Sequence, residues 1–538
     1  MRNKFFLVGC FFLVMGIVGL LILDSPLRAS QPVTLTSPEG APLTATYYPG
    51  TASRGIILFE GFGADQHMMR PMARDLNAAG WHVFTFDYSG HGASTGSLGY
   101  DNAATDRLAG QAQTAMQEFQ RLSGLDASQI VWLGHSLGAR VALQSAVLGP
   151  LRPQRLVLIG AQVNLVTNEQ AEFFTGTQDV DLPWVQSLDL QNPSVPILLV
   201  IGSWDDILTP QAATKLMMKL CGEETTYCAG EFAREFVSVN GVFHNYEIYS
   251  PRLLSSVWVW LAQADAPIPS TSGLRLGLWV SFLLGVFLVL MGLLRAIPRR
   301  PLGDEGITVS NPKKLVWGRV WLWLPALPLS GGIMYLYLLI PLPSPAFNLI
   351  YGGFLGGYGF LIGVLYLFGR MPGVTGSLRG LRINSTALTN GWLLAAAFNV
   401  MLFSSLAFFY RSGIGMVPPV GDRFLWIFIF MPLTALGFWL GMLESQALSR
   451  AAPDKPHYRL WTLLISLLPF YLYIGLLISL ASVSGVLSAF TGLVILAVGF
   501  MQSEITYRLT SSAILAAVLQ AILVYMLILP SGALFTPL

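Results

Sequence analysis

The apolar positions of the chain follow two different patterns. Long uninterrupted apolar runs occur at the N-terminus and throughout the second half, whereas residues 31–265 contain short apolar runs separated by amphipathic stretches. A helix needs about 20 mostly apolar residues to cross a bilayer. Nine runs are close to this length: residues 5–23, 274–294, 316–341, 348–369, 389–410, 424–443, 460–481, 484–501 and 512–530. The pattern predicts an N-terminal anchor at residues 1–30, a separate domain at residues 31–265 and an all-α membrane domain of about eight helices at residues 266–538.

The first apolar run has the position of a signal peptide but not its length. Arg2 and Lys4 are followed by about 19 mostly apolar residues, longer than the roughly 7–15 residues of a signal-peptide core. The segment at residues 27–30 is also a poor match to a small-residue cleavage site. We therefore expect an uncleaved transmembrane anchor.

Residues 31–265 alternate between predicted strands and predicted helices. Short β-rich runs occur at residues 32–37, 42–48, 55–60, 81–86, 129–134, 155–161, 195–202 and 235–240. Helical stretches separate most of them, notably at residues 66–79, 102–122, 137–149 and 210–220. The later strands are almost wholly apolar, as in strands buried on both faces. This alternation predicts an α/β fold with a mostly parallel eight-stranded sheet and helices on both faces.

The net charge of +2 conceals two parts of opposite sign. Residues 31–265 carry a net charge of −10, and residues 266–538 carry +10. The chain has no Lys/Arg-rich run and its one large non-membrane domain is acidic, so we expect no nucleic-acid partner. Charged residues make up 11% of the chain, against roughly 25% in soluble proteins, which again indicates a membrane protein.

The basic residues also orient the predicted spans, because cytoplasmic loops are enriched in Lys and Arg. A cytoplasmic N-terminus places these basic residues inside: Arg295, Arg299, Arg300, Lys313, Lys314, Arg319, Arg370, Arg379, Arg382, Arg450, Lys455, Arg459 and Arg508. The domain at residues 31–265 and the C-terminus are then extracytoplasmic. No ionisable residue lies in the middle of a predicted span, so the sequence assigns the membrane domain no chemistry of its own.

One stretch of the middle domain carries a recognisable chemical motif. An apolar run at residues 130–133 leads into Gly134, Ser136 and Gly138, and a helical stretch follows directly. Gly-x-Ser-x-Gly between a buried strand and a helix is typical of a nucleophile elbow, in which a tight turn exposes the serine hydroxyl. We therefore predict that Ser136 is a nucleophile.

A serine nucleophile needs a base and an acid that orients it, and in this architecture they follow in the order Ser, acid, His. The strand at residues 195–202 is followed by Asp205 and Asp206, and both fit the position of the acid. We favour Asp205, with Asp206 bracing the turn. His244 follows the last predicted strand and is the predicted base.

The backbone N–H groups of Leu137 and Phe62 are the predicted donors of an oxyanion hole. Leu137 starts the helix after the nucleophile, and Phe62 lies in the loop after the third strand. His91 and His135 are interpreted as structural residues of a loop and of the elbow.

From Gly55 to His244 the sequence resembles the α/β-hydrolases, close in pattern to the monoacylglycerol lipase, lysophospholipase and serine aminopeptidase group. The residues that carry the resemblance are Glu60-Gly61-Phe62-Gly63, Asp87 through Ser94, the elbow at Ser136, Asp205 and His244. Glu60 and Ser89 depart from the family pattern, which usually has histidine at the first position and often arginine at the second. Glu60 changes the charge expected near the oxyanion pocket. The resemblance implies hydrolysis of an ester, thioester or amide without a metal or an organic cofactor.

Two further features concern the surroundings of the predicted site. The insertion between Ala161 and Val195 is expected to form a small lid over an open pocket. Cys221 and Cys228 are close in sequence, and an oxidising compartment would allow a disulfide between them.

The predicted function is a membrane-bound serine hydrolase that cleaves an ester. A lipid-linked ester is plausible because the bilayer would concentrate it beside the enzyme. A peptide substrate, cleaved by an aminopeptidase-like enzyme, is the main enzymatic alternative. In an alternative of another class, the membrane domain is a transporter or a scaffold and the hydrolase domain is an accessory.

Overall fold

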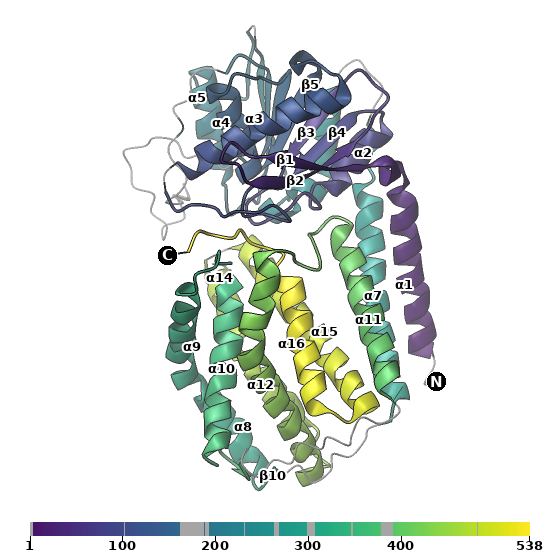
Figure 1. The fold of residues 1–538 in the computed structure, drawn as a ribbon, viewed down its shortest axis with the longest axis vertical. Helices are drawn as coiled ribbons and strands as arrows, with labels where there is room; N and C mark the ends of the chain where they lie inside the picture. Colours follow the sequence, from purple (N-terminus) through teal and green to yellow (C-terminus); the bar gives the residue numbers. More distant parts are fainter. Residues whose placement is uncertain are drawn as a thin grey trace.

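The computed structural model of the protein describes residues 4–101, 103–161, 188, 193–230, 232–262, 268–298, 307–345, 348–377, 391–480 and 482–537. These residues form a domain built on a β-sheet (the sheet domain) and a bundle of long helices (the helical domain), which lie end to end (Figure 1). The sheet domain is inserted between the first helix of the bundle and all its later helices.

The described part of the sheet domain contains a nine-stranded sheet of order β1-β2-β4-β3-β5-β6-β7-β9-β8. Strands β3, β4, β5, β6, β7 and β9 are parallel, and β1, β2 and β8 pair antiparallel at the edges. The strands are β1 (Gln31–Thr36), β2 (Pro42–Tyr48), β3 (Gly55–Phe59), β4 (His82–Phe86), β5 (Ile130–His135), β6 (Arg155–Ile159), β7 (Ile197–Gly202), β8 (Tyr227–Cys228) and β9 (Arg234–Val239). The eight predicted strands are all present. The prediction of eight missed β8, whose two residues are too few to produce a periodic pattern.

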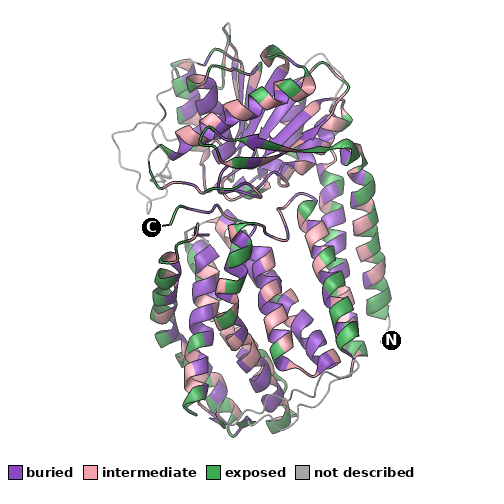
Figure 2. Ribbon diagram, viewed as in Figure 1, coloured by how far each residue is buried: buried purple, intermediate pink, exposed green. Residues whose placement is uncertain are grey.

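Helices cover both faces of this sheet. α3 (Ala104–Ser123), α4 (Leu137–Leu148) and α5 (Pro210–Cys221) pack on one face, and α2 (Arg70–Ala78) and α6 (Pro251–Ala262) pack on the other. Successive strand residues alternate between the two cores, and the central strands β3, β5 and β7 are buried along their whole length (Figure 2). This is why the central strands read as continuous apolar runs. Helix α6 was not predicted from the sequence.

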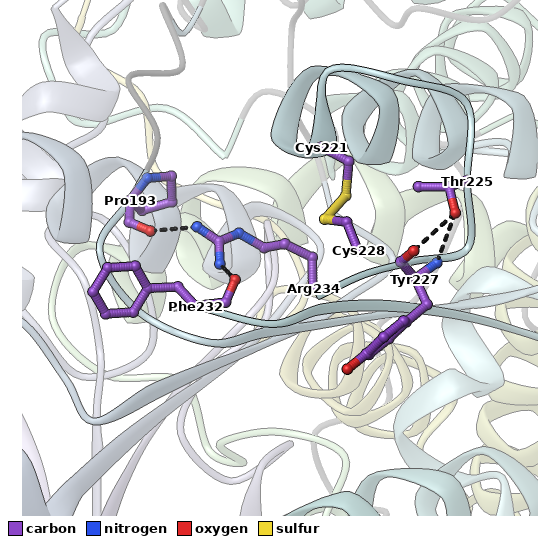
Figure 3. The surroundings of a disulfide bond; sticks show 7 residues. All are labelled: Pro193, Cys221, Thr225, Tyr227, Cys228, Phe232 and Arg234. Atoms are coloured by element: carbon purple, nitrogen blue, oxygen red, sulfur yellow. Dashed lines mark hydrogen bonds between the residues drawn. A yellow bond between two sulfur atoms is a disulfide. The ribbon is translucent and has the colours of Figure 1, made fainter. Parts of the chain in front are cut away.

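A disulfide joins Cys221, the last residue of α5, to Cys228 in β8 (Figure 3). The Thr225 hydroxyl accepts a hydrogen bond from the Tyr227 N–H at 3.2 Å inside the enclosed loop. On the neighbouring strand β9, the guanidinium of Arg234 donates to the carbonyl of Pro193 at 2.6 Å. These contacts hold the edge of the sheet beside α5.

The helical domain contains a helix at each of the nine predicted positions. They are α1 (Lys4–Leu23), α7 (Ser272–Ala296), α8 (Pro312–Trp321) with α9 (Trp323–Leu338), α10 (Leu349–Leu367), α11 (Trp392–Arg411), α12 (Asp422–Ala451), α13 (His457–Ser466) with α14 (Leu468–Ser479), α15 (Val483–Thr510) and α16 (Ala513–Ile528). Among the described residues, six helices are long and apolar enough to cross a membrane, or up to eight if each of the two bent pairs is one span. The pairs α8–α9 and α13–α14 bend by 45° and 59°.

Helix α1 packs along α7 through small residues. The helices that precede and follow the sheet domain in the sequence therefore lie side by side (Figure 1). A Cβ atom on Gly9 would lie 2.6 Å from the backbone nitrogen of Val289, and one on Gly16 would lie 2.8 Å from Phe282. Small residues of this kind allow close packing of membrane helices. The N-terminal helix is therefore packed into the helical domain.

Two buried glutamates, each paired with an arginine, lie beyond the predicted ends of their spans. α12 and α15 continue past residues 443 and 501, and these extensions carry Glu444 and Glu504. Arg319 of α8 donates to Glu444 at 3.0 Å, and Arg508 donates to Glu504 at 2.9 Å. The first pair links α8 to α12, whereas the second lies within α15, where Arg508 also donates to the carbonyl of Ile297, just after α7, at 3.0 Å.

Candidate active site

Ser136 occupies a sharp turn between β5 and α4. Its backbone has φ +56°, an uncommon conformation for a residue other than glycine, and its N–H donates to the carbonyl of Ile159 on β6 at 2.9 Å. A Cβ on Gly134 would collide with the carbonyl of Gly138, and a Cβ on Gly138 would collide with the carbonyl of Phe59 on β3. The Gly-x-Ser-x-Gly spacing therefore follows from the close approach of three backbone segments.

Ser136, His244 and Asp205 form one hydrogen-bonded chain. His244 Nε2 lies 3.0 Å from Ser136 Oγ, and His244 Nδ1 lies 2.8 Å from Asp205 Oδ2. The three residues lie in three loops at the carboxyl ends of β5, β7 and β9, which the parallel sheet brings to one edge. All three are buried, with Ser136 retaining 8% of its exposure.

The structure separates the two candidate acids. Asp205 faces His244, and its second oxygen accepts the N–H groups of Ile207 and Leu208 at 2.9 and 2.8 Å. Asp206 points to the helical domain and contacts Ser482 and Ser484 at the start of α15. Asp205 is therefore the neighbour of His244, and Asp206 holds the turn from the other side.

Residues 56–191 match the family model described as the alpha/beta hydrolase fold. This part of the chain has the α/β-hydrolase fold. Two uncharacterised proteins of Mycobacterium tuberculosis are each 27% identical to the chain over 236 residues, which span 41% of the chain and 75% of the relative.

Esterases are among the similar solved structures. One from Pyrococcus furiosus is 15% identical and covers 44% of this chain and 91% of its own, with a TM-score of 0.36. One from Thermogutta terrifontis is 19% identical and covers 44% of this chain and 100% of its own, with a TM-score of 0.32. The fold and the family match together support hydrolase activity.

The buried groups around His244 shift its pKa in opposite directions. Burial lowers the pKa of His244, but the charge and hydrogen bond of Asp205 outweigh it and raise the pKa above its ordinary 6.5. His135 stacks on His244 with ring centroids 4.8 Å apart, and burial lowers its pKa well below 6.5. His135 is thus a neutral neighbour, as expected for a structural residue.

Glu247, which the sequence did not single out, is a further buried carboxyl beside these groups. Its Oε1 accepts the Gly202 N–H at 2.7 Å, and its Oε2 lies 3.4 Å from His135 Nε2 and 3.7 Å from His244 Nδ1. Burial, followed by the charge of Asp205, raises the pKa of Glu247 to about 8. Gly160 has φ +50° and leaves the space that Glu247 fills, since a Cβ there would collide with Glu247 Oε2.

His135, His244 and Glu247 also form a cluster whose potential metal-ligand atoms lie within 4.8 Å of one another. Both ring nitrogens of His244 are already engaged by Ser136 and Asp205. Glu247 Oε1 is likewise engaged, because it accepts the Gly202 N–H at 2.7 Å.

The two segments that carry the predicted oxyanion donors adjoin Ser136. Leu137 is the first residue of α4, where helix N–H groups lack intrahelical partners. Gly61 lies against the elbow, with its ideal Cβ position 3.3 Å from Ser136 Cβ, so the loop that carries Phe62 adjoins the nucleophile. The Phe62 ring packs against His91 and against Phe535 of the C-terminal tail, with centroids 6.0 Å apart in each pair.

Glu60 and Ser89, the two residues that depart from the family pattern, are both buried. Glu60 accepts the Tyr88 N–H at 3.2 Å, and burial followed by the charge of Asp87 raises its pKa well above 4.5. Burial therefore favours its neutral form, so Glu60 is not a solvated charge at the site. His91 is buried with a pKa of about 3, chiefly because of burial, in line with a structural role.

The predicted lid lies mostly outside the described residues. Between Ala161 and Val195 the structure describes residue 188 and the residues from Pro193 onward.

Proposed function

We propose that the chain is a membrane-bound serine hydrolase that cleaves esters through an acyl-enzyme. The hydrogen-bonded chain from Ser136 through His244 to Asp205 carries this proposal, because it supplies a nucleophile, a base and an orienting acid in sequence. Its order along the polypeptide is the order expected for this fold.

The proposed reaction has two stages. His244 Nε2 takes the proton of Ser136 as Oγ attacks the acyl carbonyl, and Asp205 fixes the ring and stabilises its positive charge. The oxyanion would be held by the N–H groups of Leu137 and Phe62. His244 then protonates the departing alkoxide, and an activated water releases the acid and restores Ser136.

The helical domain supports a membrane location for this reaction. With the positive-inside orientation, the sheet domain and the C-terminus lie outside the cytoplasm, and the ends of the bundle that carry basic clusters lie inside. The catalytic edge of the sheet faces the opposite ends of the helices, where Gly63 and Asp65 contact Gly532 and Met416. A lipid-linked ester at the membrane surface is therefore the substrate class that this placement favours.

A fluorophosphonate probe tests the proposal on the full-length protein in membranes. We expect the wild type to be labelled and Ser136→Ala to remain unlabelled, while both retain the same thermal unfolding profile. Absence of labelling in the folded wild type, or equal labelling of the variant, would refute the triad. A panel of acyl esters and aminopeptidase substrates, with Ser136→Ala as the blank, then separates an esterase from a peptidase.

A further inference from the structure

Both catalytic loops of the hydrolase domain rest on the helical domain. We define the acid loop as residues 203–209 and the oxyanion loop as residues 60–66. The acid loop contacts the start of α15, and the oxyanion loop contacts the segment before α12 and the tail after α16. These contacts join residues that are hundreds of positions apart in the sequence.

The contact at the acid loop is a helix cap. Asp206 Oδ1 accepts the Ser484 hydroxyl at 2.6 Å, while its Oδ2 accepts the Ser484 N–H at 3.1 Å and the Ser482 hydroxyl at 2.9 Å. The carboxylate therefore lies at the N-terminus of a 28-residue helix, where backbone N–H groups and the helix dipole favour a negative charge. Hydrogen bonds to an ionised acceptor are among the stronger ones in proteins.

The adjacent residue is the acid of the triad. Asp205 and Asp206 are adjacent in the chain, but their carboxylates bind different partners. Asp205 binds His244, and Asp206 binds the start of α15. If α15 released Asp206, a second carboxylate would be free to move beside His244, and the loop would lose its anchor on that side. The helix thus fixes both the position of the loop and the choice of acid.

The oxyanion loop is held in a similar way. The Gly63 carbonyl accepts the Gly532 N–H at 2.7 Å, and Asp65 Oδ2 accepts the Met416 N–H at 2.6 Å. The tail itself is paired on both sides, because Phe535 bridges Leu98 of the hydrolase domain and Ser344 of the helical domain. In Figure 1 the tail runs between the two domains.

We propose that the helical domain is a working part of the active site, with Ser482 and Ser484 as positioning residues that hold the Asp205 loop through Asp206. The inference rests on the proposed serine-hydrolase function. Neither serine touches the triad, so their effect passes through the acid loop to the alignment of Asp205 with His244. Misalignment of a catalytic group by about 1 Å is enough to cost on the order of 100-fold in rate.

The test compares Ser482→Ala/Ser484→Ala with the wild type as full-length proteins in detergent micelles. Fluorophosphonate labelling gives both a rate constant and an end point, which reports the fraction of folded active sites. We expect the rate constant, and kcat for p-nitrophenyl butyrate, to fall on the order of 10- to 100-fold. The end point and KM should not change, because the substrate does not contact the serines.

Three further variants sharpen the result. Ser488→Ala removes a hydroxyl one turn along α15 that bonds the Ser484 carbonyl, not Asp206, and should label at the wild-type rate. Ser484→Thr keeps the hydroxyl and should restore most of the rate. If the double variant does not fold, Ser484→Ala alone keeps the backbone contact and should still label several-fold more slowly.

The outcomes separate this inference from the proposed function. A double variant with the wild-type rate constant overturns the inference, and so does one that loses end point without loss of rate, since that pattern reports lost folding. A wild type that is not labelled, or a labelled Ser136→Ala, overturns the proposed function itself.

Discussion

The buried carboxyl of Glu247 gives a prediction with a sign and a magnitude. In the folded protein its pKa is about 8 because of burial and the neighbouring charge of Asp205, whereas its ordinary value is 4.5. Between these two pH values the unfolded chain releases this proton and the folded chain retains it. The stabilising contribution is therefore fully present below pH 4.5 and is lost as the pH rises towards 8.

Linkage fixes the size of this loss. Each pH unit between the two pKa values lowers the free energy of unfolding by about 1.4 kcal/mol, so the whole interval amounts to several kcal/mol. Glu247→Gln removes the titration and keeps an oxygen for the Gly202 N–H. The stability of the variant relative to the wild type should therefore increase with pH from about 5 to 8 and level off above 8.

Denaturant titrations of the full-length protein in detergent, followed by tryptophan fluorescence at pH 5, 6, 7 and 8, measure this difference. The exposed Glu224, changed to Gln, is the matched control and should leave the pH dependence unaltered. A Glu247→Gln difference that stays constant to within about 1 kcal/mol over this range would refute the assignment of a raised pKa.

The remaining predictions concern the triad and the tail. Asp205→Asn should lower kcat about 10⁴-fold while Asp206→Asn has a much smaller effect, and equal losses would contradict the separation of the two acids. The raised pKa of His244 should place the ascending limb of the kcat/KM profile above pH 6.5, and a limb below that value would contradict it. Phe535→Ala should destabilise the protein by about 3 kcal/mol and slow labelling of Ser136, whereas Phe535→Leu should preserve most of both, as thermal unfolding and labelling rates would report.

The elbow was predictable because its chemistry is local. The glycines around Ser136 are required because other backbone segments pack closely against them. These segments belong to the turn itself or to the neighbouring strand β3. The alternation of strands and helices predicted parallel strands, whose carboxyl ends meet at one edge of the sheet. Asp205 and His244 could therefore be placed at this edge from the predicted ends of their strands. The nine apolar runs were equally local signals, and each contains a helix.

The rest depended on contacts that no local pattern encodes. Glu247 follows His244 in a short helical turn and resembles an ordinary surface glutamate in sequence, and only the space beside Gly160 and the ring of His135 bury it. The extensions of α12 and α15 beyond the apolar spans were hidden because Glu444 and Glu504 read as the polar end of a helix. The sequence could not distinguish Asp205 from Asp206 as the acid, because the residues that bind Asp206 lie at the start of α15, far away in the sequence.

The two connections between the domains give a reason why the hydrolase domain would depend on the helical domain. The polypeptide enters the hydrolase domain from α1 and leaves it to α7, and these helices pack together, so both connections lie at one corner of the domain (Figure 1). Two adjacent connections alone would allow the domain to tilt about that corner. The contacts at α15, at Met416 and at the tail lie beneath the catalytic edge and oppose such a tilt. The same contacts therefore hold both the domain and the proposed catalytic loops, so a tilt of the domain would also displace the loop of Asp205.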